Sequence, residues 1–428
     1  MSNILDVWLL GTKIGVLEQD HGRMRFTYDA DYGAKPDAVA LSVSMPLPST
    51  FPLELPVSFS GWAYEDNIAR PFFAGLLPDD LVRLRLAKLL GVSEKNSFGL
   101  LEAIGGECAG AVTILPEGHK PEQEDAGDII TLDDEGVFEM LSTLRHRPLL
   151  AGENNVRLSL AGAQDKVAVR MGEDGEIFLM RGGAPTTHII KPLINGAHDI
   201  VDSVHNELFC LKLAAAVDLP TAQASIGYAK DEPYLCVKRY DRTMQDDKVL
   251  RIHQEDFCQA LSVPPEHKYE NEGGPTIEQS TSVLQNHSIR PAQDRMVFMR
   301  LVIFNFMIGN ADAHGKNFSL LYEGGKPSLA PAYDLFSTAI YPNLASKMAM
   351  KIGGKYNPNH VYLRHWTKLV PDTALAQKAL KKELDLLCDN VREKALEIKS
   401  ELEGKDIKSE IYDQIIAVIK KRCDQIQM

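Results

Sequence analysis

A polar loop that directly follows an apolar helix is the feature that most constrains this chain. Residues 296–308 form an apolar segment that predicts a buried helix, and the Gly309-Asn310 pair after it is a normal helix stop. Four polar or charged side chains crowd the loop that comes next: Asp312, His314, Lys316 and Asn317. Charged groups beside a buried helix need partners or a ligand. The loop is therefore a candidate site, although turn chemistry also explains an isolated Asp or Asn.

The spacing of two of these side chains indicates a particular chemistry. Asp312 and Asn317 stand in the D-x-x-x-x-N pattern of a kinase catalytic loop, where the Asp takes the proton of a hydroxyl group and the Asn binds a metal ion. Asp334 follows between apolar residues, as a metal-binding Asp does downstream of such a loop. The pattern alone is weak, so its interpretation depends on the rest of the chain.

Composition narrows the classes of protein that remain. The chain has 428 residues, of which 44% are hydrophobic and 25% charged, as in soluble globular proteins with two or three domains. A net charge of −13 means that the surface as a whole does not attract nucleic acid. No apolar run approaches the roughly 18 residues that span a membrane, and the first residues lack a signal-peptide pattern. Six scattered cysteines without a C-x-x-C motif predict reduced thiols in a cytoplasmic protein.

The order of patterns along the chain predicts an α+β fold with two lobes. Short alternating segments and glycine turns predict a β-rich domain over residues 1–115. A connection rich in Pro, Gly and acids follows over residues 116–130. Residues 131–250 would complete the amino-terminal lobe, and residues 251–428 would form a mostly helical carboxyl-terminal lobe.

A run of small residues is a candidate phosphate-binding loop. Residues 159–166 lead into a strand expected at residues 167–170. Small side chains let backbone N–H groups approach phosphates closely. The run has a single glycine, Gly162, so it matches neither the P-loop nor the protein-kinase glycine pattern. A plain hairpin turn remains the alternative interpretation.

A lysine at the end of a β-branched strand would need anionic partners. Lys191 ends the segment 187–191, and an inward lysine on a central strand is costly unless it is paired. ATP phosphates would satisfy it together with the carboxylate of Glu207, which lies on a helix expected to start near residue 203. The alternative places Lys191 at a sheet edge and Glu207 in a solvated first turn.

The following strand leads into a charged segment that would join the two lobes. In a two-lobed kinase the adenine ring contacts the backbone of this hinge, so Lys238, Arg239 and Tyr240 are candidate nucleotide contacts. Backbone recognition leaves no side-chain pattern, and these three residues are predicted from their position alone.

Five elements occur in the order that ATP-dependent phosphoryl transfer uses: a small-residue loop, a strand lysine, a helix glutamate, the D-x-x-x-x-N loop and a downstream aspartate. We predict that Asp312 is the base or orients the acceptor hydroxyl. Asn317 and Asp334 would hold Mg²⁺, and Lys191 would bind ATP phosphates. The other polar side chains of the loop would brace it or contact phosphate.

Four motifs in this order resemble those of the HipA family, the serine/threonine-kinase toxins of bacterial HipBA toxin–antitoxin pairs. The motifs are Ser159-Leu160-Ala161-Gly162-Ala163-Gln164-Asp165-Lys166, Thr187-His188-Ile189-Ile190-Lys191-Pro192, His253-Gln254-Glu255-Asp256-Phe257-Cys258-Gln259-Ala260 and Gly309-Asn310-Ala311-Asp312-Ala313-His314-Gly315-Lys316-Asn317-Phe318-Ser319. The resemblance covers nearly the whole chain, including the β-rich first domain with its Gly75-Leu76-Leu77-Pro78-Asp79-Asp80 segment.

The resemblance implies a two-lobed protein-kinase-like fold with a largely helical carboxyl-terminal lobe. It implies that residues 161–166 form the ATP loop, that Asp312 is catalytic and that Ser159 is autophosphorylated. It places a further group around the nucleotide and Mg²⁺: His314, Gly315, Lys316, Asn317, Tyr333 and Asp334.

The resemblance also implies partners. A small helix-turn-helix antitoxin, HipB, would bind the chain, and the complex on operator DNA would repress transcription, with DNA contacted mainly through the antitoxin. The best-known target of the family is the aminoacyl-tRNA synthetase for glutamate. A membrane is not among the expected partners.

Ser159 has a physical argument of its own, since it lies beside the candidate phosphate loop. A phosphate there would add about −1.5 to −2 charge, repel ATP phosphates and could displace the loop. Autophosphorylation would then silence the enzyme. The alternative is an ordinary turn serine.

Two other functions remain open. A small-molecule phosphotransferase of the aminoglycoside-kinase type has a similar Asp-x4-Asn loop. A non-catalytic scaffold that binds an antitoxin and acts only as a co-repressor would need no ATP, although the apparently complete set of polar groups argues against it.

Overall fold

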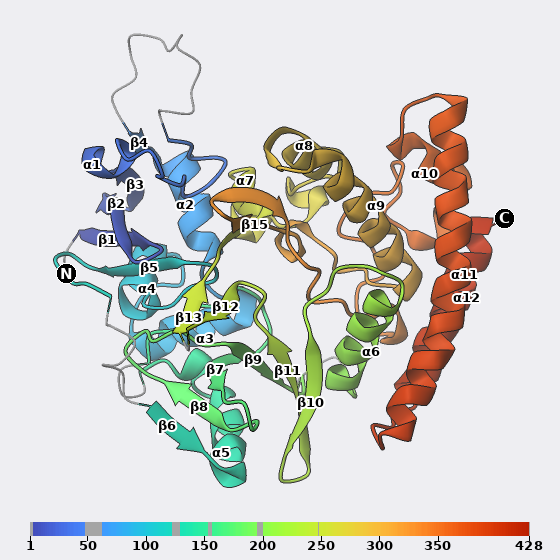
Figure 1. Cartoon of the computed structure of the whole chain (residues 1–428), viewed down its shortest axis with the longest axis horizontal. Coiled ribbons are helices and arrows are strands. Elements are labelled where there is room, and N and C mark those ends of the chain that lie inside the picture. Colours follow the sequence, from blue (N-terminus) through green and yellow to red (C-terminus); the bar gives the residue numbers. More distant parts are fainter. Residues whose placement is uncertain are drawn as a thin grey trace.

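A computed structural model describes residues 3–47, 62–121, 129–152, 156–194, 200–246 and 248–427. Sheets dominate the first half of the chain and helices the second (Figure 1). This arrangement confirms the α+β class expected from the sequence. Residues 122–128 of the predicted connection lie outside the described residues.

The first sheet is antiparallel, with five strands in the order β4-β3-β2-β1-β5. Its strands are β1 (Ile4–Leu9), β2 (Thr12–Asp20), β3 (Arg23–Tyr28), β4 (Ala63–Tyr64) and β5 (Val112–Pro116). Three helices accompany it: α2 (Asp66–Gly75), α3 (Asp80–Leu90) and α4 (Ser97–Ile104). The alternating apolar residues of β3 explain its packing, since Met24, Phe26 and Tyr28 are all buried in one core.

The second sheet has six strands in the order β10-β11-β9-β7-β8-β6. Its strands are β6 (Ile129–Leu132), β7 (Val167–Met171), β8 (Ile177–Met180), β9 (His188–Pro192), β10 (Ala224–Ala229) and β11 (Glu232–Lys238). Helix α5 (Asp134–Leu144) lies near β6 and β10, and α6 (Ser203–Ala216) packs on β10 and β11. Because β9 pairs with both β11 and β7, Lys191 lies on an inner strand and not at the edge.

The helical half surrounds α9 (Pro291–Ile308), which ends at Gly309 in a left-handed conformation (φ 74°). The helix expected at residues 296–308 is therefore present, but only residues 301–308 are buried throughout, whereas Met296 is exposed. Neighbouring elements are α7 (Phe257–Ala260), α8 (Ile277–His287), α11 (Ala374–Gly404), α12 (Ile411–Gln427) and a small sheet of β14 (His253–Asp256), β15 (Ser319–Glu323) and β16 (Lys326–Leu329).

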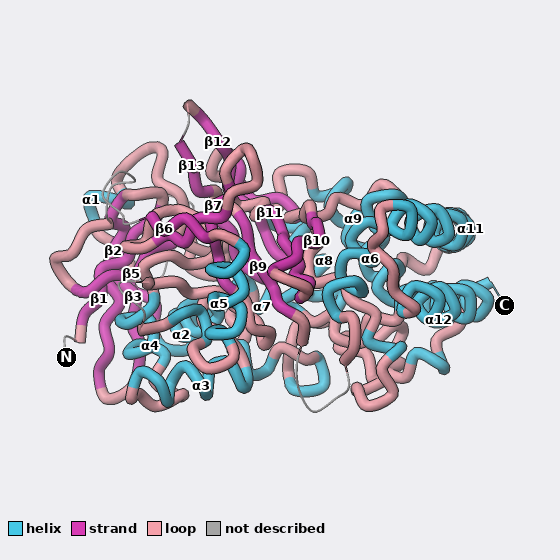
Figure 2. The backbone as a smooth tube through the Cα atoms, turned by 90° about the horizontal axis from the view of Figure 1, so that it is seen from below, coloured by secondary structure: helices cyan, strands magenta, loops and turns pink. Residues whose placement is uncertain are grey.

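The two halves lie at opposite ends of the molecule. Figure 2 shows the strands gathered at one end and the long α11 and α12 at the other. A hairpin of β12 (Arg242–Gln245) and β13 (Lys248–Arg251) projects from the strand-rich part. None of the helices in the described ranges is long and apolar enough to cross a membrane.

Buried charges join the first sheet unit to the rest of the chain. The carboxylate of Glu255 on β14 accepts hydrogen bonds from the Ser42 hydroxyl, the Val43 N–H (2.9 Å) and the Tyr322 hydroxyl. Burial raises the pKa of Glu255 to about 7. Such groups are costly to bury without partners, so these contacts fix how the first unit sits on the helical half.

Candidate active site

A cavity of about 850 Å³ lies where the second sheet, α6 and the loop after α9 meet. Nearly all of the residues predicted from the sequence line it. The lining includes Ala161, Gly162, Ala163, Gln164, Asp165, Lys166, Lys191, Glu207, Lys238, Arg239, Tyr240, Asp312, His314, Lys316, Asn317, Tyr333 and Asp334. Ser159 and Gly315 are the two predicted residues that do not line it.

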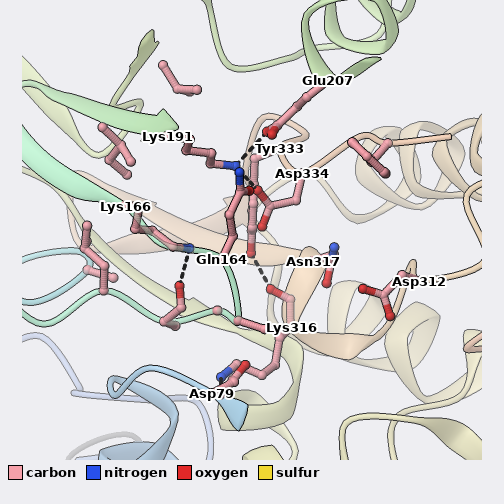
Figure 3. Close-up of a pocket in the computed structure, with 18 of the residues that line it drawn as sticks. Asp79, Gln164, Lys166, Lys191, Glu207, Asp312, Lys316, Asn317, Tyr333 and Asp334 are labelled. Atoms are coloured by element: carbon pink, nitrogen blue, oxygen red, sulfur yellow. Dashed lines mark hydrogen bonds and ion pairs between the residues drawn. The ribbon is translucent and has the colours of Figure 1, made fainter. Parts of the chain in front are cut away.

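Lys191 forms the centre of the charged side chains in this cavity. Its ammonium donates to Glu207 Oε1 at 2.7 Å and also to Asp334 Oδ1, and all three side chains appear together in Figure 3. Lys191 and Glu207 are each only 5% exposed, so the ion pair is buried and its geometry is held by β9 and α6. The alternative of a solvated surface lysine is therefore wrong.

The protonation states of this group follow from its charges. Burial disfavours the Lys191 ammonium, but the carboxylates of Asp334 and Glu207 outweigh burial and raise the pKa of Lys191 above its ordinary value. Burial alone would raise the pKa of Asp334, yet the ammonium groups of Lys191 and Lys166 hold it well below its usual range. Both groups are thus charged near neutral pH, as a phosphate- and metal-binding pair would have to be.

The small-residue loop lies against the first sheet unit. Gly162 has φ +112°, a backbone conformation that favours glycine, and a Cβ added there would lie 2.5 Å from Lys166 Nζ. Lys166 donates to the carbonyl oxygen of Ala161 at 2.6 Å, and burial lowers the pKa of this lysine. Gln164 donates to the carbonyl oxygen of Pro192 at 3.2 Å. The loop thus places a buried lysine and closely approachable backbone at the cavity wall.

Asp312 is exposed and lies on the side of the cavity away from Lys166 (Figure 3). The side-chain oxygen of Asn310 accepts from its N–H at 3.1 Å, and Asp312 Oδ1 accepts from the Tyr269 hydroxyl at 2.7 Å. The first bond fixes the backbone at Asp312 and the second its carboxylate, which remains reachable from solvent. An acceptor as large as a protein could bring a hydroxyl group to it.

The residues after Asp312 have separate roles in the loop. His314 is buried, and burial lowers its pKa to about 4, so the imidazole is neutral near neutral pH. Gly315 faces away from the cavity, since a Cβ there would lie 2.5 Å from Pro275 Cγ. The Tyr333 hydroxyl donates to the carbonyl oxygen of Lys316 at 2.7 Å and so holds the backbone of the loop in place.

The hinge side chains differ in what they contact. The Arg239 guanidinium is committed to a buried ion pair with Asp241 (2.9 Å) and contacts Glu107 (3.4 Å). The Tyr240 ring lies 5.7 Å from that of Tyr333, measured between centroids. Lys238 is exposed and its N–H donates to the carbonyl oxygen of Gln223 at 2.8 Å. Arg239 therefore holds the hinge in place, and Tyr240 supplies an aromatic face at the cavity.

The oxygen ligands in the cavity fit a hard cation such as Mg²⁺. Asp334, Asn317 and Asp312 follow one another across the site (Figure 3). Within the described part of the chain, no group of three or more His, Cys, Asp or Glu side chains could hold a metal by itself. Mg²⁺ commonly binds through one or two carboxylates and completes its shell with phosphates and water. The Asp334 carboxylate, which contacts Lys191, and the Asn317 amide, which also lines the cavity, match that mode.

Asp79 and Tyr269 contact predicted site residues but were not themselves predicted from the sequence. Asp79, at the start of α3, pairs with Lys316 at 2.7 Å, and the Tyr269 hydroxyl donates to Asp312 at 2.7 Å. The Pro78-Asp79-Asp80 segment predicts a helix start, and Tyr269 belongs to no motif. The only local signal for Asp79 was that two acids, Asp79 and Asp80, stand at this helix start, where one capping side chain is enough.

Comparisons with known proteins agree over the whole chain. Residues 5–115 match the family model of the HipA N-terminal domain, and residues 158–395 match the HipA-like C-terminal domain. The chain is 41% identical over 397 residues to the putative kinase Y4mE of Sinorhizobium fredii, which covers 91% of this chain and 90% of that protein. It is 30% identical over 327 residues to the serine/threonine-protein kinase toxin HipA of Shewanella oneidensis, with 73% of each chain covered.

A solved structure has the same fold. The chain matches a Shewanella oneidensis structure of HipA, HipB and operator DNA with a TM-score of 0.80 and 26% sequence identity. The match covers 99% of this chain and 97% of that one. The two-lobed kinase-like arrangement expected from the motifs is thereby confirmed.

Proposed function

Because the chain belongs to the HipA family of kinase toxins, we propose that it transfers the γ-phosphate of Mg²⁺-bound ATP to a serine or threonine of a protein. The observation that carries the proposal is one cavity lined by Lys191, Asp334, Asn317 and Asp312. These are the cation, metal-binding and acceptor-side groups that phosphoryl transfer uses.

The proposed mechanism assigns each group one task. Lys191, oriented by Glu207, binds the ATP phosphates and balances their charge. Asp334 and Asn317 would hold Mg²⁺, which would neutralise charge that develops on the phosphate oxygens. Asp312 accepts a hydrogen bond from the acceptor hydroxyl and takes its proton as the phosphate moves. The Tyr269 hydroxyl, which donates to Asp312 now, marks a position that an acceptor hydroxyl could take.

The proposed acceptor is a translation component. The resemblance supports an aminoacyl-tRNA synthetase, the glutamate–tRNA ligase, whose phosphorylation would inhibit growth and promote persistence. A HipB-type antitoxin is the proposed partner, and the two would co-repress their operon with operator DNA contacted mainly by the antitoxin. The match to a HipA–HipB–DNA structure supports this assembly. All six cysteines are buried and form no disulfide, in keeping with the cytoplasmic location that we propose.

A transfer assay tests the proposed activity. Purified protein is incubated with γ-labelled ATP, Mg²⁺ and glutamate–tRNA ligase, and label on the ligase is the expected result. Label on a small molecule such as an aminoglycoside would instead favour a small-molecule phosphotransferase. Absence of ATP turnover, with antitoxin and operator binding intact, would favour a co-repressor without catalysis.

We also propose that Ser159 is the autophosphorylation site. Its hydroxyl is fully buried and donates to the carbonyl oxygen of Leu76 at 2.8 Å, while its N–H donates to the carbonyl oxygen of Glu107 at 2.8 Å. A phosphorylated serine cannot donate that hydrogen bond, and its charge and bulk do not fit a buried site. The loop would have to leave the first sheet unit before it is modified and could not return afterwards.

Ser159→Ala should therefore keep its transfer activity while losing self-inhibition. Initial transfer to the acceptor should stay within about fivefold of wild type, since one neutral hydrogen bond contributes about 1 kcal/mol. Preincubation with ATP should silence the wild type and leave Ser159→Ala active, as measured by label transferred per minute. Exposed Ser93→Ala is the control and should be silenced like wild type. Equal self-labelling of Ser159→Ala and wild type would remove Ser159 as the site.

A further inference from the structure

Asp79 occupies a helix start without acting as a helix cap. It precedes α3, but its side chain accepts no capping hydrogen bond. The carboxylate instead points to the loop after α9, where Oδ1 lies 2.7 Å from Lys316 Nζ. Lys268 Nζ approaches the other oxygen at 3.5 Å. Figure 3 shows Asp79 and Lys316 on the side of the cavity opposite Lys191.

The backbone of the same residue holds the small-residue loop. The Asp79 N–H donates to the carbonyl oxygen of Gly162 at 3.1 Å, and Pro78 forms a parallel bridge with Gly162. Asp79 thus contacts both loops that would face the ATP phosphates, one through its side chain and one through its main chain. It belongs to residues 5–115, a region that contributes none of the predicted kinase motifs.

The pair is buried, which makes its geometry rigid. Asp79 is 7% exposed and Lys316 6% exposed. Burial alone would raise the pKa of Asp79, but the ammonium groups of Lys316 and Lys268 outweigh burial and lower it. A buried ion pair is seldom a net gain in stability over apolar packing. Its position beside the phosphate loop therefore favours a role in the reaction.

We propose that Asp79 is a positioning residue for phosphoryl transfer, which holds the Lys316 ammonium and the Gly162 turn in register beside the ATP phosphates. The inference rests on the proposed kinase function and deepens it, because it makes the first domain part of the working site. The carboxylate also places a negative charge near the phosphates. It thereby restrains Lys316 from a close pairing with bound ATP and keeps this cation available as charge develops during transfer.

Asp79→Asn tests this role because it removes the charge and preserves the shape and the N–H bond to Gly162. We expect kcat to fall at least about tenfold while a non-hydrolysable ATP analogue binds about threefold or more tightly, because the Lys316 ammonium, released from Asp79, can then pair closely with its phosphates. Binding of ADP should tighten less, and binding of adenosine should not change. Titration calorimetry and a transfer assay measure the two effects.

Asp80→Asn is the matched control. Its side chain is 62% exposed and pairs with Lys268 at 3.0 Å, not with Lys316, and its φ of +47° is one that asparagine also adopts. Its kcat and its affinity for the ATP analogue should both stay within about twofold of wild type. Asp79→Glu keeps the charge and moves it by one methylene, so it should slow transfer less than Asp79→Asn and leave the affinity for the analogue unchanged.

Lys316→Met provides the coupling test. If Asp79 acts through Lys316, adding Asp79→Asn to Lys316→Met should change neither kcat nor the affinity for the ATP analogue by more than about twofold. A parallel loss of turnover and of affinity for all three ligands in Asp79→Asn would overturn the proposal, because that is the behaviour of a structural support. So would kinetics equal to those of Asp80→Asn, or tightening in Asp79→Glu as large as in Asp79→Asn. Partial unfolding weakens the apparent affinity for every ligand by the same factor, so the ratio of the affinities for the ATP analogue and adenosine still gives a result for a less stable variant. A wild-type protein that binds no ATP would refute the kinase proposal instead.

Discussion

Asp312→Asn is expected to lower kcat for phosphoryl transfer by about 10³, within the range of 10²–10⁴ that a positioned general base contributes. The substitution keeps the hydrogen bond from Tyr269, which donates to Oδ1, and removes only the ability to take a proton. Affinity for ATP should stay within about twofold, because Asp312 lies on the acceptor side of the cavity. Single-turnover transfer from γ-labelled ATP gives the rate and calorimetry gives the affinity.

The exposed Asp372→Asn serves as the control and should retain wild-type rates. Expression of the wild type in bacteria should arrest growth, and Asp312→Asn should relieve the arrest while Asp372→Asn does not. A transfer rate for Asp312→Asn within threefold of wild type would show that another group accepts the proton.

Lys191→Met should have the second largest effect, and it should affect both activity and stability. The loss of the cation should reduce kcat/KM for ATP by about 10² or more. It would also leave the buried carboxylate of Glu207 and the half-buried one of Asp334 without their shared ammonium. Removing one partner of a buried ion pair typically costs about 3–5 kcal/mol. A transfer assay and a thermal unfolding curve measure the two effects.

A second substitution separates these two effects. Adding Glu207→Gln to Lys191→Met removes one of the stranded charges, so the melting temperature should recover in part while activity stays low. Lys212→Met on the same helix as Glu207 is the control, since Lys212 forms only a partly exposed pair with Glu401 (3.3 Å). Recovery of activity together with the melting temperature would mean that Lys191 supports the fold and does not bind phosphate.

Local patterns were sufficient to predict the parts of the site that depend on spacing along one element. The Asp312 and Asn317 spacing, the lysine that ends β9 and the glutamate on α6 are each set by a few neighbouring residues, and the cavity contains all four. Membership of a motif did not settle orientation, however. Gly315 lies within the loop motif but packs against Pro275, where there is no room for a Cβ.

The contacts between distant segments could not be predicted in this way. Asp79 and Lys316 are separated by 237 residues, and nothing near either one indicates the other. Arg239 was predicted as a hinge contact from position alone, whereas its side chain also contacts Glu107, which lies 132 residues away in the sequence. Such pairs depend on how the first unit packs on the rest of the chain, which sequence periodicity does not encode.

Calorimetric titration with a non-hydrolysable ATP analogue, with and without Mg²⁺, tests most directly whether the cavity is a metal–nucleotide site. The wild type should bind the analogue, and Mg²⁺ should increase the affinity at least about tenfold, which corresponds to about 1.4 kcal/mol. Asp334→Asn should lose this increase, because we propose its carboxylate as the main protein ligand for the ion. No binding by the wild type, or the same Mg²⁺-dependent increase in Asp334→Asn, would contradict the assignment of Lys191, Asn317 and Asp334 to Mg²⁺-ATP.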